Sequence, residues 1–200
     1  MRQRRVLEDY IARHGEFQTS LVPLELHAGA PLVAQRMARA ARRVGVGPMA
    51  AVAGAMAQCA AEAALRAGVQ EVIVENGGDI YLKATGPVTI GLDAGTAKLA
   101  DRLAFALSAE ETPISICSSS GKMGHSMSLG RCDLATVVAR DAALADAAAT
   151  MAANLVTTVS DVDHAVERIA DIEGIDGVLI VKDDRIGLAG QLPSLTKAHP

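Results

Sequence analysis

Apolar residues recur at helical spacing in five parts of the chain and form short continuous or alternating runs between them. The helical spacing predicts helices at residues 2–14, 31–44, 48–67, 142–157 and 161–172. The short runs predict strands at residues 71–75, 80–83, 88–92, 114–117, 134–139, 177–182 and 185–188. Residues 17–27 are predicted to be extended, and the span 96–110 fits either a helix or a strand.

Turn signals join several of these strands directly to their neighbours along the chain. Asn76-Gly77-Gly78-Asp79, Gly86-Pro87 and Asp183-Asp184 each stand between two predicted strands. Strands joined by short turns pair antiparallel, and long helices separate the groups of strands, so the pattern favours an α+β fold over regular βαβ winding. We expect one domain over residues 1–192 and a flexible C-terminal tail over residues 193–200.

The amino-acid composition limits the kinds of core and of binding partner that the protein can have. Half of the residues are hydrophobic and only two tyrosines and two phenylalanines are aromatic, so the core must consist mainly of Ala, Val, Leu, Ile and Met. The net charge of −4, with both signs interspersed, and the shortage of aromatic rings argue against nucleic-acid binding. The longest uncharged run, residues 48–61, is too short to span a membrane. The alanine-rich helices favour close packing and suggest a homodimer.

The number and spacing of the cysteines indicate the redox environment of the protein. Cys59, Cys117 and Cys132 are an odd, sparse set without the paired spacing of a disulfide framework or a zinc site. Such a set is typical of a reduced environment, so we expect a cytoplasmic protein.

The predicted helix at 142–157 carries a stripe of small polar residues. Asp146, Thr150 and Asn154 follow one another at intervals of four residues and therefore share one helical face. A solvent-facing stripe usually consists of Lys, Glu and Arg, so this stripe is expected to face a ligand or a buried polar network. Asp and Thr oxygens suit Mg²⁺, which keeps waters and often bridges phosphates. Spacing alone leaves the structural network as the stronger of the two interpretations.

A Ser/Gly turn after the strand at 114–117 forms the second candidate site. Ser118, Ser119, Ser120 and Gly121 offer hydroxyl and backbone N–H donors to an anion. His125 is the candidate for acid–base chemistry near neutral pH. Cys117 is a candidate nucleophile if its thiol is acidified, although a buried small hydrophobic residue is the more frequent role. The serines also fit an ordinary polar turn.

The turn from Asn76 to Asp79 is the third candidate. Gly77 and Gly78 permit close approach of a ligand to the backbone, while Asn76 and Asp79 offer polar side chains that read hydroxyl groups or ring edges. By itself such a turn more often belongs to a simple hairpin.

These pieces together resemble the ApbE-like superfamily, which includes the FAD:protein FMN transferases. The segments ENGGDIYL, SSSG and LATVVARDAALADAAAT resemble its GGD segment, its Ser-Gly turn, and its strand followed by the A-D-A-x-x-T helix. A bacterial and archaeal branch of the superfamily also shows VGPMAAVAGA and CSSSGKMGHSMSLG in this order. The resemblance covers roughly residues 2–190 and implies a T-fold-like architecture of antiparallel sheet and long packed helices.

The resemblance also implies a cofactor site. In the flavin transferases the Asp and Thr of the A-D-A-x-x-T helix help to hold Mg²⁺ at the diphosphate of the flavin nucleotide, and the matching residues here are Asp146 and Thr150. The GGD region, here Gly77, Gly78 and Asp79, is expected to lie near the nucleotide, FAD or FMN.

Two departures separate this chain from the transferases. Their Lys-Gly pair before the GGD strand is replaced by Ala51-Val52-Ala53-Gly54, and the Asp-Pro that follows their histidine is replaced by Ser126-Met127-Ser128 after His125. We therefore expect an ApbE-like protein that binds a phosphate-bearing small molecule with Mg²⁺ and is not a standard FMN transferase. The alternatives are a non-catalytic binding or assembly protein and a sulfur-transfer component. The second follows from the association of this branch with sulfide-dependent homocysteine formation, in which Cys117 would handle sulfur.

Overall fold

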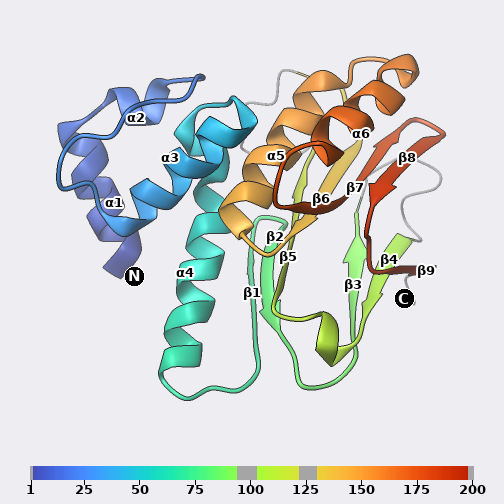
Figure 1. Cartoon of the computed structure of the whole chain (residues 1–200), viewed down its shortest axis with the longest axis horizontal. Coiled ribbons are helices and arrows are strands. Elements are labelled where there is room, and N and C mark those ends of the chain that lie inside the picture. The colour runs from blue at the N-terminus through green and yellow to red at the C-terminus, as the bar shows by residue number, and fades with distance from the viewer. Residues whose placement is uncertain (1, 94–102, 122–129, 198–200) are drawn as a thin grey trace.

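The computed structural model describes residues 2–93, 103–121 and 130–197 (Figure 1). The helices are α1 Arg2–Arg13, α2 Glu16–Thr19, α3 Leu32–Val44, α4 Val52–Arg66, α5 Ala142–Leu155 and α6 Val162–Ala170, with 3₁₀ turns η1 Pro48–Ala51, η3 Ala109–Glu111 and η4 Val159–Asp161. The strands are β1 Val72–Asn76, β2 Asp79–Lys83, β3 Val88–Leu92, β4 Leu103–Leu107, β5 Ile114–Ser119, β6 Leu134–Ala139, β7 Ile175–Lys182, β8 Arg185–Gly190 and β9 Ser194–Lys197.

The strands form two sheets. One has six strands in the order β1-β2-β5-β6-β7-β8, and the other has three in the order β3-β4-β9. Every pairing in both sheets is antiparallel. The predicted α+β fold with antiparallel sheets is therefore confirmed.

Three layers result, with the six-stranded sheet between the helices and the smaller sheet (Figure 1). Side chains alternate across β5 accordingly: Cys117 joins the core cluster on the helical side, whereas Ile114 and Ile116 join the cluster between the two sheets. Residues with small side chains predominate under the helices, and larger ones such as Phe105 and Leu179 fill the space between the sheets.

Close packing explains the alanine content of the helices. α5 is buried along most of its length, between α3, α4 and the sheet. The alanines therefore serve contacts within one protomer, so the composition gives no separate support to a homodimer, which stays a prediction. No described helix is by itself long and apolar enough to cross a membrane; only α3 and the segment Pro48–Arg66 pass that test as a pair, bent by 107°.

Three sequence expectations need correction or completion. Residues 17–27 were expected to be extended, but Glu16–Thr19 forms α2, whose Phe17 packs edge-on against Tyr10 of α1. The expectation of a flexible tail from residue 193 fails at Ser194–Lys197, because these residues pair with β4 as β9. In the ambiguous span 96–110, Leu103–Leu107 is a strand, and residues 94–102 lie outside the described part of the chain.

Candidate functional site

Polar residues from four elements converge on the helical side of the six-stranded sheet. The register pairs Asn76 with Asp79 and Asp79 with Cys117, so these three side chains point to the same face. Above them lie the first turn of α4 and the polar stripe of α5. The structure thus brings the Asn76–Asp79 turn, Cys117 and Asp146 together, although they are far apart in the sequence.

α4 and α5 cap each other at this point. Oδ2 of Asp146 accepts a hydrogen bond of 2.8 Å from the backbone N–H of Gly54 in the first turn of α4. In return, Oε1 of Gln58 accepts a bond of 2.9 Å from the N–H of Ala142, the first residue of α5. Both bonds satisfy N–H groups that a helix leaves unpaired at its start. The structural interpretation of Asp146 therefore has a definite partner.

Gly54 permits this contact. A Cβ atom at residue 54 would lie 2.2 Å from the carbonyl oxygen of Ala142 and 2.9 Å from Cβ of Asp146. Any side chain would therefore force the two helices apart. Sequence reasoning did not assign a role to Gly54 or Gln58, and the signals that mark them are a glycine in a helix interior and a glutamine on an alanine-rich helix.

Asp79 is the least satisfied polar group of the site. Its side chain is buried, with 6% exposure, and Oδ1 has no hydrogen-bond partner among the described residues. Burial raises the pKa of Asp79 to about 7, against the lowering effects of the Cys117 thiol and the Ser118 backbone. An uncompensated buried carboxylate is costly, so this oxygen is well placed to receive a cation or a donor group.

The charge of Asp79 also affects the ionisation of Asp146. Burial, followed by the charge of Asp79, raises the pKa of Asp146 well above its ordinary value, while the N–H groups of Gly54 and Ala53 oppose the shift. Two carboxylates that share a buried space cannot both ionise cheaply unless a positive charge stands near them. Carboxylate oxygens are the preferred ligands of hard divalent cations, so the residues present fit Mg²⁺.

Cys117 lies in the same buried space, and its surroundings keep it protonated. The residue is fully buried, and its Sγ contacts the carbonyl oxygen of Ala142 at 3.5 Å. Burial, and then the charges of Asp79 and Asp146, raise the pKa of the Cys117 thiol well above its usual range. Because the thiolate is the reactive form, this environment disfavours the predicted nucleophilic role.

The glycine turn is tied to its neighbours by hydrogen bonds. Gly77 and Gly78 have φ angles of 69° and 97°, which favour glycine. The side-chain amide of Asn76 donates to the carbonyl oxygen of Ala53 at 3.1 Å, and the N–H of Ser118 donates to the carbonyl of Gly78 at 3.2 Å. The turn is therefore fixed against both α4 and β5.

The serines of the Ser/Gly turn do not all face this space. Oγ of Ser118 lies 2.9 Å from Oγ1 of Thr136, on the side of the sheet opposite to Cys117. Oγ of Ser120 donates to the carbonyl of Cys132, which also accepts the N–H of Gly121. Ser119 follows Ser118 on β5 and so returns to the helical side. His125 lies outside the described residues.

The remaining stripe residues extend the site along α5. Thr150 and Asn154 are partly buried, one and two turns beyond Asp146. β5 lies beside the start of the same helix, where Cys117 contacts Ala142. Gly130, which follows β5 in the chain, lies beside the end of the helix, since a Cβ there would be 1.9 Å from the carbonyl of Ala153. The stripe therefore extends from Asp146 toward the C-terminal end of α5. At this end of the helix, Gly130 also lies close to Gly121.

Comparison with known proteins places the chain among relatives. A family model described as AbpE bacteria matches residues 1–181. The UPF0280 protein of Methanococcus aeolicus is 36% identical over an alignment of 201 residues that covers 98% of this chain and 81% of the relative. The UPF0280 protein of Archaeoglobus fulgidus is 40% identical over an alignment of 198 residues that covers 96% of this chain and 81% of the relative.

Solved structures give a more distant likeness. The flavinyl transferase ApbE of Pseudomonas stutzeri, in its apo form, has a TM-score of 0.47 and 14% identity, covering 76% of this chain and 48% of that one. The flavin transferase ApbE of Vibrio cholerae has a TM-score of 0.46 and 16% identity, covering 95% of this chain and 74% of that one. The family assignment comes from the family model and the sequence relatives. On that basis, the chain belongs to the AbpE bacteria family.

Proposed function

We propose that this protein binds a phosphate-bearing small molecule, with a flavin nucleotide as the first candidate, together with Mg²⁺. Asp146 and Thr150 would hold the metal ion, and Asp79 lies near enough for its charge to raise the pKa of Asp146. When bound, Mg²⁺ would neutralise the negative charge of the phosphates and orient them. The protein itself supplies the acidic ligands, the shelter from water and the fixed glycine turn.

The observation that carries this proposal is the buried pair Asp79 and Asp146. Oδ1 of Asp79 has no hydrogen-bond partner among the described residues, and the charge of Asp79 helps to raise the pKa of Asp146. The hydrogen bond that the backbone N–H of Gly54 donates accounts for one oxygen of Asp146 but leaves Asp79 unexplained. A divalent cation would relieve both carboxylates at once.

The flavin part of the proposal comes from the resemblance of the GGD turn and the A-D-A-x-x-T helix to those of the flavin transferases. The stretch that replaces the Lys-Gly pair of the transferases, Ala51–Gly54, lies at the first turn of α4 beside Asp146. The candidate site beside Asp146 therefore lacks the lysine of the transferases. We therefore place binding of a flavin nucleotide ahead of flavin transfer to a protein.

The test is a titration of FAD, FMN and Mg²⁺ against purified protein by calorimetry and flavin fluorescence. The decisive variant is Asp146→Asn, because the amide oxygen still accepts the N–H of Gly54 while the negative charge is lost. We expect nucleotide binding that requires Mg²⁺ in the wild type and is weakened at least about tenfold in Asp146→Asn, Asp79→Asn and Thr150→Val.

The matched control is Asp141→Asn, which changes the N-cap of α5, where Asn serves nearly as well as Asp. It should bind like the wild type. Wild-type protein that binds neither nucleotide, with or without Mg²⁺, contradicts the proposal, and so does binding that survives Asp146→Asn unchanged.

A non-catalytic binding or assembly role is the second candidate. It is favoured by the missing lysine and Asp-Pro and by the protonated, buried thiol of Cys117. Wild type and a Cys117→Ser/His125→Ala variant would then complement a deletion strain equally well. The sulfur-transfer alternative requires a persulfide on Cys117, and its detection by mass spectrometry would favour that role instead. The three free cysteines fit our placement of the protein in the cytoplasm.

A further inference from the structure

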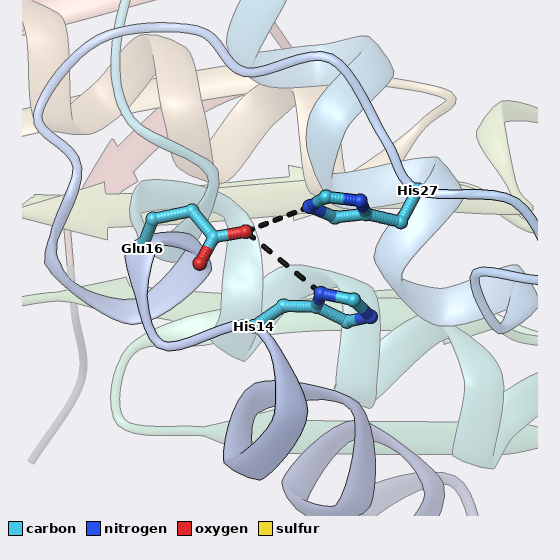
Figure 2. A group of neighbouring side chains, drawn as sticks. All are labelled: His14, Glu16 and His27. Carbon is cyan, nitrogen blue, oxygen red and sulfur yellow. Dashed lines mark hydrogen bonds and ion pairs between the residues drawn. The ribbon is translucent and has the colours of Figure 1, made fainter.

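Three metal-binding side chains that are scattered in the sequence meet at the N-terminal end of the fold. His14 follows α1, Glu16 begins α2, and His27 lies in the segment before α3 (Figure 2). One ligand atom from each residue lies within 4.8 Å of the ligand atoms of the other two. The spacing of His14 and His27 in the sequence gives no sign of this cluster.

Figure 2 shows both imidazoles directing a nitrogen at the same oxygen of Glu16. Oε1 of Glu16 is 2.9 Å from Nε2 of His27 and 3.9 Å from Nδ1 of His14. The two rings are stacked, with centroids 4.0 Å apart and planes 13° from parallel. Oε1 of Glu16 thus lies beside one nitrogen of each ring, and a metal ion that replaced the imidazole protons would have all three ligand atoms around it.

The surrounding structure holds the donors in place. The N–H of His14 bonds to carbonyl groups of Tyr10 and Ile11 at the end of α1, and the ring of His14 packs on that of Tyr10 at 4.6 Å. The Tyr10 hydroxyl accepts the backbone N–H of His27 at 3.3 Å. Because Tyr10 is itself buried, one rigid side chain positions both histidines.

We propose that His14, Glu16 and His27 bind a single transition-metal ion of the Zn²⁺ class. Two imidazole nitrogens and one carboxylate oxygen form a borderline donor set that suits Zn²⁺ better than Mg²⁺. Ligand atoms of a tetrahedral zinc ion lie about 3.3 Å apart. The 2.9 Å between Glu16 and His27 must therefore lengthen slightly, and the 3.9 Å between Glu16 and His14 must shorten. The side chains have the freedom to do so, since 23% of His14, 53% of Glu16 and 56% of His27 is exposed.

The cluster has a route to solvent. His27 also lines a hollow of about 330 Å³ together with Arg39 and Arg42 of α3. Glu16 and His27 are themselves exposed, so a metal ion can reach them from solvent, and the positions that the three protein ligands leave open remain available to water or a small anion. This site is separate from the Asp79–Asp146 pair, which offers hard carboxylate ligands to Mg²⁺ on the helical face of the sheet.

The test uses the whole 200-residue chain, stripped with chelator and titrated with Zn²⁺ by calorimetry, with Co²⁺ absorption as a second readout. We expect one equivalent of Zn²⁺ to bind the wild type and a visible Co²⁺ band that reports nitrogen and oxygen ligands. His14→Ala, His27→Ala and Glu16→Gln should each weaken Zn²⁺ binding by at least about tenfold. His164→Ala, which removes an exposed histidine on α6, is the control and should change nothing.

Circular dichroism of each variant establishes that it is folded before titration. Absence of stoichiometric Zn²⁺ binding in folded wild type overturns the proposal. Binding that persists in the His14→Ala/His27→Ala double variant overturns it too. Asp146→Asn should retain the Zn²⁺ equivalent, so failure of the nucleotide proposal and failure of this one are separately visible.

Discussion

A single carboxyl group, that of Asp79, illustrates how position decides chemistry. On the surface it would be an ordinary turn residue after two glycines. Pairing of β2 with β5 instead places it under the helices, opposite Cys117 and close to Asp146. Its folded-state pKa of about 7 exceeds its ordinary value of 3.8, because burial disfavours the charged form.

The pKa of Asp79 predicts how stability depends on pH. Between pH 3.8 and about 7 the folded state keeps a proton that the unfolded chain releases, so the free energy of unfolding of metal-free protein should fall as pH rises through this window. The raised pKa of Asp146 acts in the same direction. Asp79→Asn should flatten the slope and stabilise metal-free protein at pH 8 by roughly 2 to 4 kcal/mol.

Denaturant unfolding across this pH range, with and without Mg²⁺, measures the effect. Mg²⁺ should stabilise the wild type more than Asp79→Asn. A wild-type slope equal to that of the variant would show that Asp79 ionises normally.

Among the elements, the crossing of α4 and α5 sets the geometry of the site. Each helix supplies a side-chain acceptor to the first turn of the other, through Asp146 and Gln58. The contact requires that the backbones approach closely, which the alanines on both helices and Gly54 allow. α4 and α5, which are separate in the sequence, therefore pack as one rigid unit beside the site.

Gly54→Ala should disrupt the packing of α4 against α5. In most helices that substitution is favourable, but here the added methyl group would overlap the carbonyl of Ala142. We expect a loss of about 1 to 3 kcal/mol in the free energy of unfolding, measured by denaturant unfolding. Gly91→Ala is the matched control, since a Cβ at Gly91 of β3 meets nothing within 4 Å. Equal stability of the two variants would mean that the helices do not approach as closely as described.

For the whole molecule, the three-stranded sheet completes the fold by covering the apolar face of the larger sheet. Phe105 of β4 is fully buried at this interface, among aliphatic residues of both sheets. The helices on the opposite face bury the candidate nucleotide site. The stability of the site therefore also depends on a layer that packs on the opposite face of the larger sheet.

Phe105→Ala should open a cavity between the sheets and cost about 3 to 5 kcal/mol of unfolding free energy. Leu195→Ala is the control on the neighbouring strand, because Leu195 pairs opposite Phe105 but is 41% exposed. Its cost should be much smaller, in thermal or denaturant unfolding. A small effect of Phe105→Ala would indicate that the second sheet is packed only loosely on the first.

The sequence by itself determined most of the elements and the class of the fold. Apolar periodicity located the helices at 2–14, 31–44 and 142–157 and most of the strands, because local burial patterns repeat with the period of the element. It failed at α2 and β9, which are short. α2 depends on the contact of Phe17 with Tyr10, and β9 on the free edge of β4.

Only the tertiary structure decided how the polar residues combine. The sequence placed Asp146 and Thr150 on one helical face and marked the turn at Asn76–Asp79, but strand register put Asp79 beside Cys117 and turned Ser118 to the other side of the sheet. The meeting of His14, Glu16 and His27 also arises only when the chain folds back on α1. Spacing specifies neighbours within one element, whereas contacts between elements depend on packing of the whole chain.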